Sequence, residues 1–551
     1  MKIKTGATLS SQSATEQVIE YHVKTKHYLD KYAAGPEFLD WDLQPNPYRY
    51  FTGIDRIALP LNLSGINSHF QSLYESPIEQ RAIFPIKKET LAILLGLSMG
   101  LSAHKEYMGD RWSLRCNPSS GNLHPTEVYL ITSEIDGLSN GIYHYLSEDH
   151  SLQQRMSPID NKLSLDSPMA LLSLTSIHWR EAWKYGERAF RYCQLDIGHA
   201  LAAMAYAARC LGWQVNILKQ CSSNHIATVC GIDRKADFEK AEQESPELII
   251  SIELAQHKAP DINPIIKLEK LIEWAKAGQW HGKANVLDNH PMYRWPVIAQ
   301  VDQATEITPI KTNKILQSDT PAPLAHDSTL LAKHVIYARR SAQRFDKQTG
   351  LSRNQFYSLL DKCLYRPDTL PWSALSEVFP MFCIFYVHRI NSLTPGLYLF
   401  ANTHLTIDQL KQQFNQNYLW SKPASCPEHL SFYLLSNVNA EKISKRLSCH
   451  QAIASDGAFS LSMFLQFEKT IIGQPMNYRK IHWQAGVLGQ LLYLEAESIG
   501  LQGTGIGCFF DDAVHQVVGL SNMEYQVIYH FTVGAALNDA RISTLPAYEH
   551  L

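Results

Sequence analysis

Three arginines stand within six residues in the stretch YARRSAQRFD. Guanidinium groups match phosphate oxygens in a forked geometry, and each charge-assisted hydrogen bond contributes roughly 1.5–3 kcal/mol. A helix is predicted just downstream, with Ser352 as its N-cap. The cluster is therefore a candidate phosphate receptor, although a solvated basic face is the commoner explanation for such a run taken alone. Its members are Arg339, Arg340, Ser341 and Arg344.

Two other stretches could bring main chain close to a flat ligand. NPSSGN, residues 117–122, combines a proline-fixed turn with polar side chains and one glycine of free φ. GLQGTGIGCFFDD, residues 500–512, places glycines where no Cβ would hold a ligand away, but lacks the strand–glycine–helix order of a dinucleotide fingerprint. Alone, each is explained as well by an ordinary loop or a helix-to-strand turn. The candidate ligand contacts are Pro118, Ser119, Ser120, Gly121, Asn122, Gly505, Ile506 and Gly507.

A lysine and a tyrosine are adjacent in HWREAWKYGERAFRY, at Lys184 and Tyr185. Either side chain, when desolvated, can act as a general acid or base, although most such pairs are structural. The 23 histidines include no HExxH or comparable ligand spacing, so no metal site is predicted.

These stretches must be positioned by a chain that is internally duplicated. FRYCQLDIGHALAAMAYAARCLGW (residues 190–213) matches YRKIHWQAGVLGQLLYLEAESIGL (residues 478–501), with Gly198 and Gly486 at equivalent places 288 positions apart. Both copies are apolar nearly all round, which predicts long buried helices that each end at a glycine. GIYHYLSEDHSLQQ likewise resembles GLYLFANTHLTIDQL, and ELIISIEL resembles YQVIYHFTVG, as strands of each copy.

The repeat predicts two α+β halves, at residues 75–257 and 325–551, joined by a polar, proline-rich connector over 258–324. Residues 1–74 are predicted as an N-terminal extended arm, because the prolines of FLDWDLQPNPYRYF oppose helix. A length of 551 residues also favours more than one domain.

Composition limits the possible partners. A net charge of −3 gives no electrostatic reason to expect nucleic acid or a membrane surface as a partner. The ten cysteines form no CxxC pair, the start carries no signal-peptide pattern, and no apolar stretch is long enough to span a bilayer. These features predict a cytoplasmic protein with reduced thiols.

Taken together, RRSxxR ahead of a helix, PSSGN ahead of a strand and GxGIGxF after a long helix resemble the nitroreductase-like flavoproteins. KYGxRxxRY, GIYHY and NPSSGNLHPTEVYL resemble the branch of SagB-type dehydrogenases, whose best-known members oxidise azolines. The resemblance implies two tandem α/β sandwich domains, each with a central antiparallel sheet flanked by helices. They would form a pseudo-dimer with FMN at the interface.

In this family one unit supplies the arginine cluster, the glycine turn and a C-terminal basic residue, for which Arg541 is the candidate. The other unit supplies the PSSGN loop. Here the first three lie only in the second half and the loop only in the first, so the resemblance implies one FMN per chain at one of two inter-half sites. In azoline oxidases the Lys-Tyr motif is assigned to proton transfer at the substrate, which makes Lys184 and Tyr185 the catalytic candidates.

The resulting expectation is an FMN-dependent oxidoreductase that transfers hydride through flavin N5 and acts on a small-molecule or peptide-derived substrate. Azoline-type dehydrogenation competes with nitro or quinone reduction using NAD(P)H. A flavin-binding or scaffold protein that has lost catalysis is the alternative of another class. Substrate identity, electron donor and any oligomerisation beyond the internal pseudo-dimer stay open.

Overall fold

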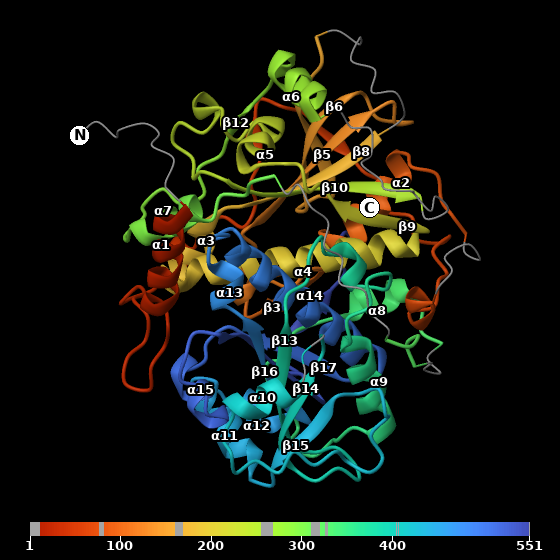
Figure 1. The fold of residues 1–551 in the computed structure, drawn as a ribbon. Helices are drawn as coiled ribbons and strands as arrows, with labels where there is room; N and C mark the ends of the chain where they lie inside the picture. The colour runs from red at the N-terminus through yellow and green to blue at the C-terminus, as the bar shows by residue number, and fades with distance from the viewer. Residues whose placement is uncertain are drawn as a thin grey trace.

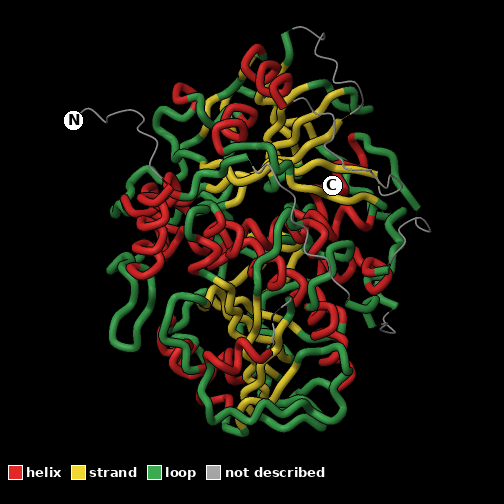
Figure 2. The backbone as a smooth tube through the Cα atoms, viewed as in Figure 1, coloured by secondary structure: helices red, strands yellow, loops and turns green. Residues whose placement is uncertain are grey.

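The computed structural model describes residues 11–75, 82–159, 169–254, 268–309, 320–324, 329–403, 405 and 407–549. Figure 1 shows two sheet-containing halves, one above the other, with two long helices crossing between them, and Figure 2 shows the same layering by secondary structure. The predicted boundary at 257/258 and the predicted start of the second half at residue 325 lie outside the described residues.

The first half is built around a sheet with strand order β11-β7-β6-β5-β8-β10-β9, and β2 also pairs with β7. Among the described residues, neighbouring strands of this sheet all pair antiparallel. The strands are β2 (Arg56–Ala58), β5 (Thr126–Ser133), β6 (Gly141–Leu146), β7 (Ser151–Ser157), β8 (Met169–Ser176), β9 (Trp213–Ile217), β10 (Ser245–Leu254) and β11 (Gln279–Trp280). The helices are α2 (Lys88–Ser98), α3 (His178–Tyr185), α4 (Ala189–Cys210) and α5 (Ser223–Cys230).

The second half has a six-stranded antiparallel sheet in the order β15-β14-β13-β16-β18-β17. Its strands are β13 (Met381–Val387), β14 (Gly396–Ala401), β15 (Phe432–Ser436), β16 (Phe459–Gln466), β17 (Gln502–Ile506) and β18 (Tyr525–Gly534). Its helices are α8 (Ala332–Ala338), α9 (Arg353–Cys363), α10 (Ile407–Gln413), α11 (Ala440–Leu447), α12 (Ile453–Asp456), α13 (Glu468–Ile471), α14 (Asn477–Ser498) and α15 (Asp511–Val518).

The two sheets have the same topology, which confirms the duplication. The order β7-β6-β5-β8-β10-β9 corresponds strand for strand to β15-β14-β13-β16-β18-β17. The sequence matches GIYHY/GLYLF and ELIISIEL/YQVIYHFTVG fall on the equivalent pairs β6/β14 and β10/β18. The strand predicted at the end of GLYLFANTHLTIDQL is wrong, because Ile407–Gln413 forms helix α10. The prediction of two α+β halves with antiparallel sheets flanked by helices is thus confirmed.

The two predicted long helices are α4 and α14, and they pack on one another at the centre of the molecule (Figure 1). Every residue of α4 is buried, and Gly212 and Gly500 follow the two helices with φ of 73° and 76°. The crossing point is set by Gly198 and Gly486. A Cβ on Gly486 would overlap the carbonyl oxygen of Leu195 and lie 2.9 Å from the Cα of Gly198. The repeated glycine is therefore where the helix backbones touch.

We expect Gly486→Ala to lower the free energy of unfolding by about 2 kcal/mol, because the helices must separate to admit the methyl group. That effect exceeds the helix propensity of about 1 kcal/mol that alanine gains over glycine. Urea denaturation measures the change. Gly35→Ala is the matched control, since nothing lies within 4 Å of its Cβ position. Equal stabilities for the two variants would contradict the close helix contact.

Several segments cross between the halves. Strand β19 (Ser543–Leu545), at the end of the second half, pairs with β3 (Leu101–Tyr107) of the first, and β3 pairs with β4 (Asp110–Arg115). The largest hydrophobic clusters also combine residues of both halves. The halves therefore share their hydrophobic cores.

The predicted arm and connector are more structured than expected. Residues 1–74 were predicted to be extended, but α1 (Ser11–Lys24) is a helix, and β1 (Phe51–Thr52) pairs with β12 (Lys283–Ala284). The prolines around residues 38–51 do exclude α-helix there, leaving one 3-10 turn at Trp41–Leu43. The connector contributes α6 (Leu268–Ala277), α7 (Pro296–Ala304) and β11, which extends the first-half sheet.

Candidate functional site

A cavity of about 980 Å³ lies between the two halves. Residues 117–122 of the first half and residues 338–343 and 504–508 of the second contribute to its wall. The cavity thus collects the polar loop, the start of the arginine cluster and the glycine stretch, which are far apart in the sequence. It is large enough for a cofactor-sized ligand.

The arginine motif reaches the cavity because it follows α8 and then pairs with the glycine strand. Ser341 forms a parallel bridge with Gly503, and the Ala342 N–H donates to the Gly503 carbonyl at 3.1 Å. The Tyr493 hydroxyl lies 2.8 Å from the Ser341 hydroxyl and accepts from the Gly505 N–H at 2.9 Å. These bonds fix the register between the two candidate ligand-binding segments.

Arg339 and Arg340 present two adjacent guanidinium groups to the cavity. Arg339 is only 4% exposed and donates to the Arg115 carbonyl at 2.9 Å, while Arg340 donates to the Ser102 hydroxyl at 3.1 Å. Burial lowers the pKa of both, and the neighbouring Arg339 helps to lower that of Arg340 to about 10. Glu497 opposes these shifts, but within the described residues neither guanidinium forms an ion pair with a carboxylate. Arg339, which is buried, and Arg340, which is half-buried, thus form a cationic site suited to an anion.

The PSSGN loop uses its hydroxyls for internal support. The Ser119 hydroxyl accepts from the His124 N–H at 2.8 Å, and the Asn122 amide donates to the Ser113 carbonyl at 3.0 Å. Gly121 and Asn122 both have φ of 60°, a left-handed turn that favours glycine and asparagine. Pro118, Ser119, Ser120, Gly121 and Asn122 all line the cavity.

The glycine stretch differs from the predicted turn in one respect. Gly505 and Ile506 belong to β17, an edge strand paired with β18, and only Gly507 lies beyond the strand. A Cβ on Gly505 would overlap the Tyr529 hydroxyl, and one on Gly507 would overlap the Tyr192 ring. Gly505 and Gly507 therefore leave room for Tyr529 and Tyr192, two tyrosines that also line the cavity.

The two catalytic candidates meet the PSSGN loop at the end of α3. A Cβ placed on Gly121 would lie 2.6 Å from the Tyr185 hydroxyl and 3.2 Å from the Lys184 ammonium. Tyr185 lines the cavity, and Lys184 lies 5.0 Å from the centroid of the Trp41 ring. Burial lowers the pKa of Lys184, against the attraction of Glu181, and burial raises the pKa of Tyr185.

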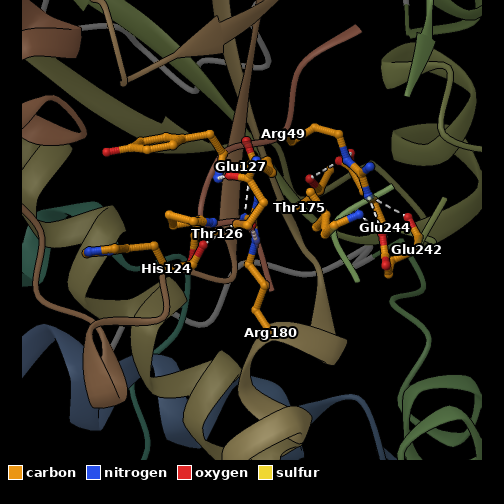
Figure 3. A network of polar contacts seen from close by, with 12 residues as sticks. Arg49, His124, Thr126, Glu127, Thr175, Arg180, Glu242 and Glu244 are labelled. Carbon is orange, nitrogen blue, oxygen red and sulfur yellow. Dashed lines mark hydrogen bonds and ion pairs between the residues drawn. The ribbon is translucent and has the colours of Figure 1, made fainter. Parts of the chain in front are cut away.

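A buried ionic network holds α3 against the strand that follows the loop (Figure 3). Arg180 pairs with Glu127 and donates to the His124 carbonyl at 2.8 Å, and Glu127 also lies 2.8 Å from His144. Burial raises the pKa of Glu127, but the attraction of Arg180 outweighs this effect, and the pKa is lowered to about 2. The network fixes the helix that carries Lys184 and Tyr185 relative to the loop. Figure 3 also shows a second ion pair beside this network, between Arg49 and Glu244. The Thr175 hydroxyl donates to the Glu244 carboxylate at 2.7 Å.

Two predicted ligand contacts, Arg344 and Arg541, and the catalytic candidate Lys184 do not line the cavity. Arg344 is exposed and does not line the cavity. Arg541 has a side chain 70% exposed, pairs with Asp539 at 2.6 Å and lies beside the Tyr107 ring. The structure thus brings together the other eleven predicted ligand contacts and leaves these two outside.

The equivalent place at the other interface is filled. Val215 and Ile217 stand 288 positions before Gly503 and Gly505, so β9 carries bulky side chains where β17 carries glycines. The 3-10 turn Trp372–Ala374 packs against β9, and Leu370 and Ala374 join Val215 in one hydrophobic cluster. The asymmetry expected from the motifs is therefore visible in the packing.

Two polar residues of α4 that the motifs missed also line the cavity, Asp196 and His199. The Ser120 N–H and hydroxyl donate to the Asp196 carboxyl at 3.2 and 3.3 Å. His199 lies 3.1 Å from the Tyr529 hydroxyl, and burial lowers its pKa to about 3, so the imidazole is neutral. The available signal was their polarity within the otherwise apolar run LDIGHALAAMA.

Asp196 predicts a pH dependence of stability. Burial raises the pKa of Asp196 to about 7, although hydrogen bonds from Ser119 and Ser120 lower it. Burial and the neighbouring Asp196 carboxyl together raise the pKa of Glu181. A carboxyl with a higher pKa in the folded state binds more protons there, so the free energy of unfolding falls as pH rises from about 4 to about 7. We expect Asp196→Asn to flatten this slope in urea denaturation at about pH 5 and about pH 8. Identical slopes for wild type and variant would contradict it.

In the parts of the chain the structure covers, no three His, Cys, Asp or Glu side chains gather as metal ligands. No helix among the described ranges is long and apolar enough to cross a membrane.

Comparison with a known structure shows the same fold. The crystal structure of a candidate nitroreductase from Anabaena variabilis superimposes with a TM-score of 0.67 at 22% identity, covering 95% of this chain and 99% of that one. The sequence profile of the nitroreductase family matches residues 85–241 and again residues 422–535. The chain therefore belongs to the nitroreductase family, an oxidoreductase family that typically uses flavin, and carries its domain twice.

Individual relatives match over shorter stretches. The candidate nitroreductase MJ1384 of Methanocaldococcus jannaschii is 26% identical over 113 residues, which is 19% of this chain and 57% of that protein. The trifolitoxin-processing protein TfxB of Rhizobium leguminosarum bv. trifolii is 31% identical over 110 residues, 17% of this chain and 29% of that protein. The chain thus spans less than two thirds of either relative.

Proposed function

We propose that the protein is an FMN-dependent oxidoreductase that binds one FMN per chain in the cavity between its halves. The observation that carries the proposal is the buried Arg339 beside the half-buried Arg340, two guanidinium groups without a carboxylate ion pair among the described residues. A buried charge of this kind needs a counter-charge, and the phosphate of FMN would supply one.

The other residues of the cavity fit such a ligand. Polar atoms without a hydrogen-bond partner surround it: Arg339 Nε, Asn117 Oδ1 and His124 Nδ1. Arg339, Arg340 and Ser341 would hold the phosphate end. Strand β17 and the PSSGN loop would face the ring. The tyrosines that occupy the Cβ space of the glycines at 505, 507 and 121 also line the cavity. When bound, FMN would supply hydride transfer to or from the substrate.

The protein's own contribution to the chemistry is proton control at the substrate. Burial lowers the pKa of the Lys184 ammonium, which makes it a better proton donor near neutral pH. Burial raises the pKa of the Tyr185 hydroxyl, which therefore keeps its proton and acts as a hydrogen-bond donor. We propose these two atoms, Lys184 Nζ and Tyr185 Oη, as the acid–base groups.

Within this function, dehydrogenation of a peptide-derived substrate competes with NAD(P)H-dependent nitro or quinone reduction. The match to a protein named for trifolitoxin processing supports the first. The family and the fold shared with candidate nitroreductases support the second. A flavin-binding protein without turnover is the third outcome.

The first test is the absorbance spectrum of the purified protein with FMN quantified against protein. We expect one FMN per chain, because the equivalent place at the other interface is packed with side chains. Two FMN per chain would contradict the proposal of a single site at one of the two interfaces. Failure to bind added FMN would contradict the proposed function itself. The reductase predicts bleaching by NADH or NADPH and reoxidation by a nitroaromatic, which a protein without turnover would not show.

A second test separates proton transfer from flavin binding. We expect Lys184→Ala to keep FMN bound while losing dehydrogenation by a factor of about 10²–10⁴. Incubating the enzyme with peptide substrates and following the loss of two hydrogens by mass spectrometry measures this. Unchanged turnover would remove Lys184 from the mechanism.

A further inference from the structure

Two cysteines face one another on the wall of the cavity. Cys449 and Cys508 both line it, and each thiol shifts the pKa of the other. Seven of the ten cysteines are buried, whereas these two and Cys426 are partly exposed. Of the three accessible thiols, only Cys449 and Cys508 belong to the cavity.

Two hydrogen bonds, one from the main chain and one from a side chain, hold the segments that carry the two cysteines side by side. The Phe510 N–H donates to the Leu447 carbonyl at 2.9 Å, and the Gln451 side chain donates to the Cys508 carbonyl at 3.2 Å. Cys449 therefore lies on a loop fixed to the Cys508 segment before and after it. Cys449 and His450 both have left-handed φ angles, of 50° and 59°, which are unusual for side chains of these types.

The surroundings make the two thiols unequal. The Ala33 N–H donates to His27 Nδ1 at 2.9 Å, so Nε2 carries the imidazole proton and is the atom that can donate to Cys508. The neighbouring Cys449 thiol has the largest influence on the pKa of Cys508. Together with His27 it outweighs burial and lowers the pKa of Cys508 to about 5. Cys508 in turn raises the pKa of Cys449.

Other charged groups face the pair from neighbouring elements. Arg188 donates to the Gly507 carbonyl at 3.2 Å and favours the thiolate of Cys508. Asp511, which pairs with Arg188 at 3.0 Å, and Tyr192 lie on the same side. A thiolate beside a protonated thiol is the arrangement of a nucleophilic and a resolving cysteine.

We propose that Cys449 and Cys508 form a redox-active dithiol that exchanges an electron pair with the flavin bound in the same cavity. Oxidation breaks the S–H bond of Cys449 and forms the Sγ–Sγ bond. The electron pair and the Cys449 proton pass to the oxidised isoalloxazine, which becomes the reduced anion, so charge and atoms balance. The reverse step returns them to the disulfide. Formation of the disulfide rests on the cysteines alone, and the exchange rests on the proposed function.

The first experiment tests the dithiol without depending on flavin. The full-length chain is reduced, freed of reductant, treated with diamide as a two-electron thiol oxidant, alkylated and digested for mass spectrometry. We expect a peptide that links Cys449 to Cys508 in wild type and in the control Cys426→Ser, and its loss in Cys449→Ser and Cys508→Ser. Alkylation of both cysteines in the oxidised wild type would overturn the proposal.

The second experiment tests exchange by anaerobic dithionite titration of the diamide-treated, FMN-loaded protein. Wild type and Cys426→Ser should take up two electron pairs per flavin, twice the uptake of Cys449→Ser or Cys508→Ser. Uptake of one pair by wild type, with the cross-link formed, would overturn the exchange. Failure of the chain to bind FMN would instead defeat the proposed function and with it the exchange, while the cross-link result would still stand.

Discussion

Arg339→Gln is expected to weaken FMN binding by about 10- to 150-fold, the equivalent of one charge-assisted hydrogen bond of 1.5–3 kcal/mol. Its guanidinium is 4% exposed, has no carboxylate ion pair among the described residues, and faces the cavity. Titration of flavin fluorescence at fixed salt measures the change. Because the group is buried, the loss should vary little with ionic strength.

Arg344→Gln is the matched control from the same motif. The sequence predicts Arg344 as a phosphate ligand, but the structure places it on the surface outside the cavity wall. We expect a change of less than about threefold, the range of an exposed charge. A loss equal to that of Arg339→Gln would contradict the structural placement. Arg340→Gln, which keeps the Arg339 bond to Arg115, separates ligand binding from that local contact.

Arg180→Met is expected to lower the free energy of unfolding by about 3–5 kcal/mol, because it leaves the Glu127 carboxylate buried without its cation. Arg180 is 1% exposed and Glu127 is 4% exposed. The loss should include looser positioning of the Lys184–Tyr185 helix, which Arg180 anchors to the His124 carbonyl. Urea denaturation at neutral pH gives the magnitude.

Two further variants make this result specific. Arg56→Met removes an ion pair to Asp149 whose side chains are 41% and 28% exposed, and should change stability by less than about 1 kcal/mol. Combining Arg180→Met with Glu127→Gln removes the orphaned charge and should recover part of the loss. No recovery in the double variant would show that packing, rather than charge, holds the helix.

Much of the fold follows from the sequence because local pattern and repetition agree. The matching runs around Gly198 and Gly486 predicted α4 and α14, and Ser352 caps α9 by accepting from the Gln355 N–H at 3.2 Å. Helix α1 was missed because its amphipathic pattern is weak and its burial depends on contacts such as Tyr21 with the distant Glu187 carbonyl. Such contacts belong to tertiary structure and leave no local signature.

The site was predictable in outline for a similar reason. PSSGN, Arg339 and Arg340 carry their chemistry in their residue types, and the structure brings them to one cavity. Arg344 and Arg541 have the same residue type but point elsewhere, which spacing alone does not reveal. Asp196 and Cys449 acquire their character from burial and from neighbours remote in sequence, so no motif marks them.

The crossing of α4 and α14 has a consequence for how the cavity between the two halves is assembled. In a two-chain enzyme such a site would fall apart on dilution, and its unfolding midpoint would shift with protein concentration. Here the two helices are joined through one polypeptide, so each meets the other at an effective concentration set by the connector. The cavity between the halves should persist at any dilution. Each half is also free to diverge in sequence by itself, whereas in a symmetric dimer one substitution alters both subunits.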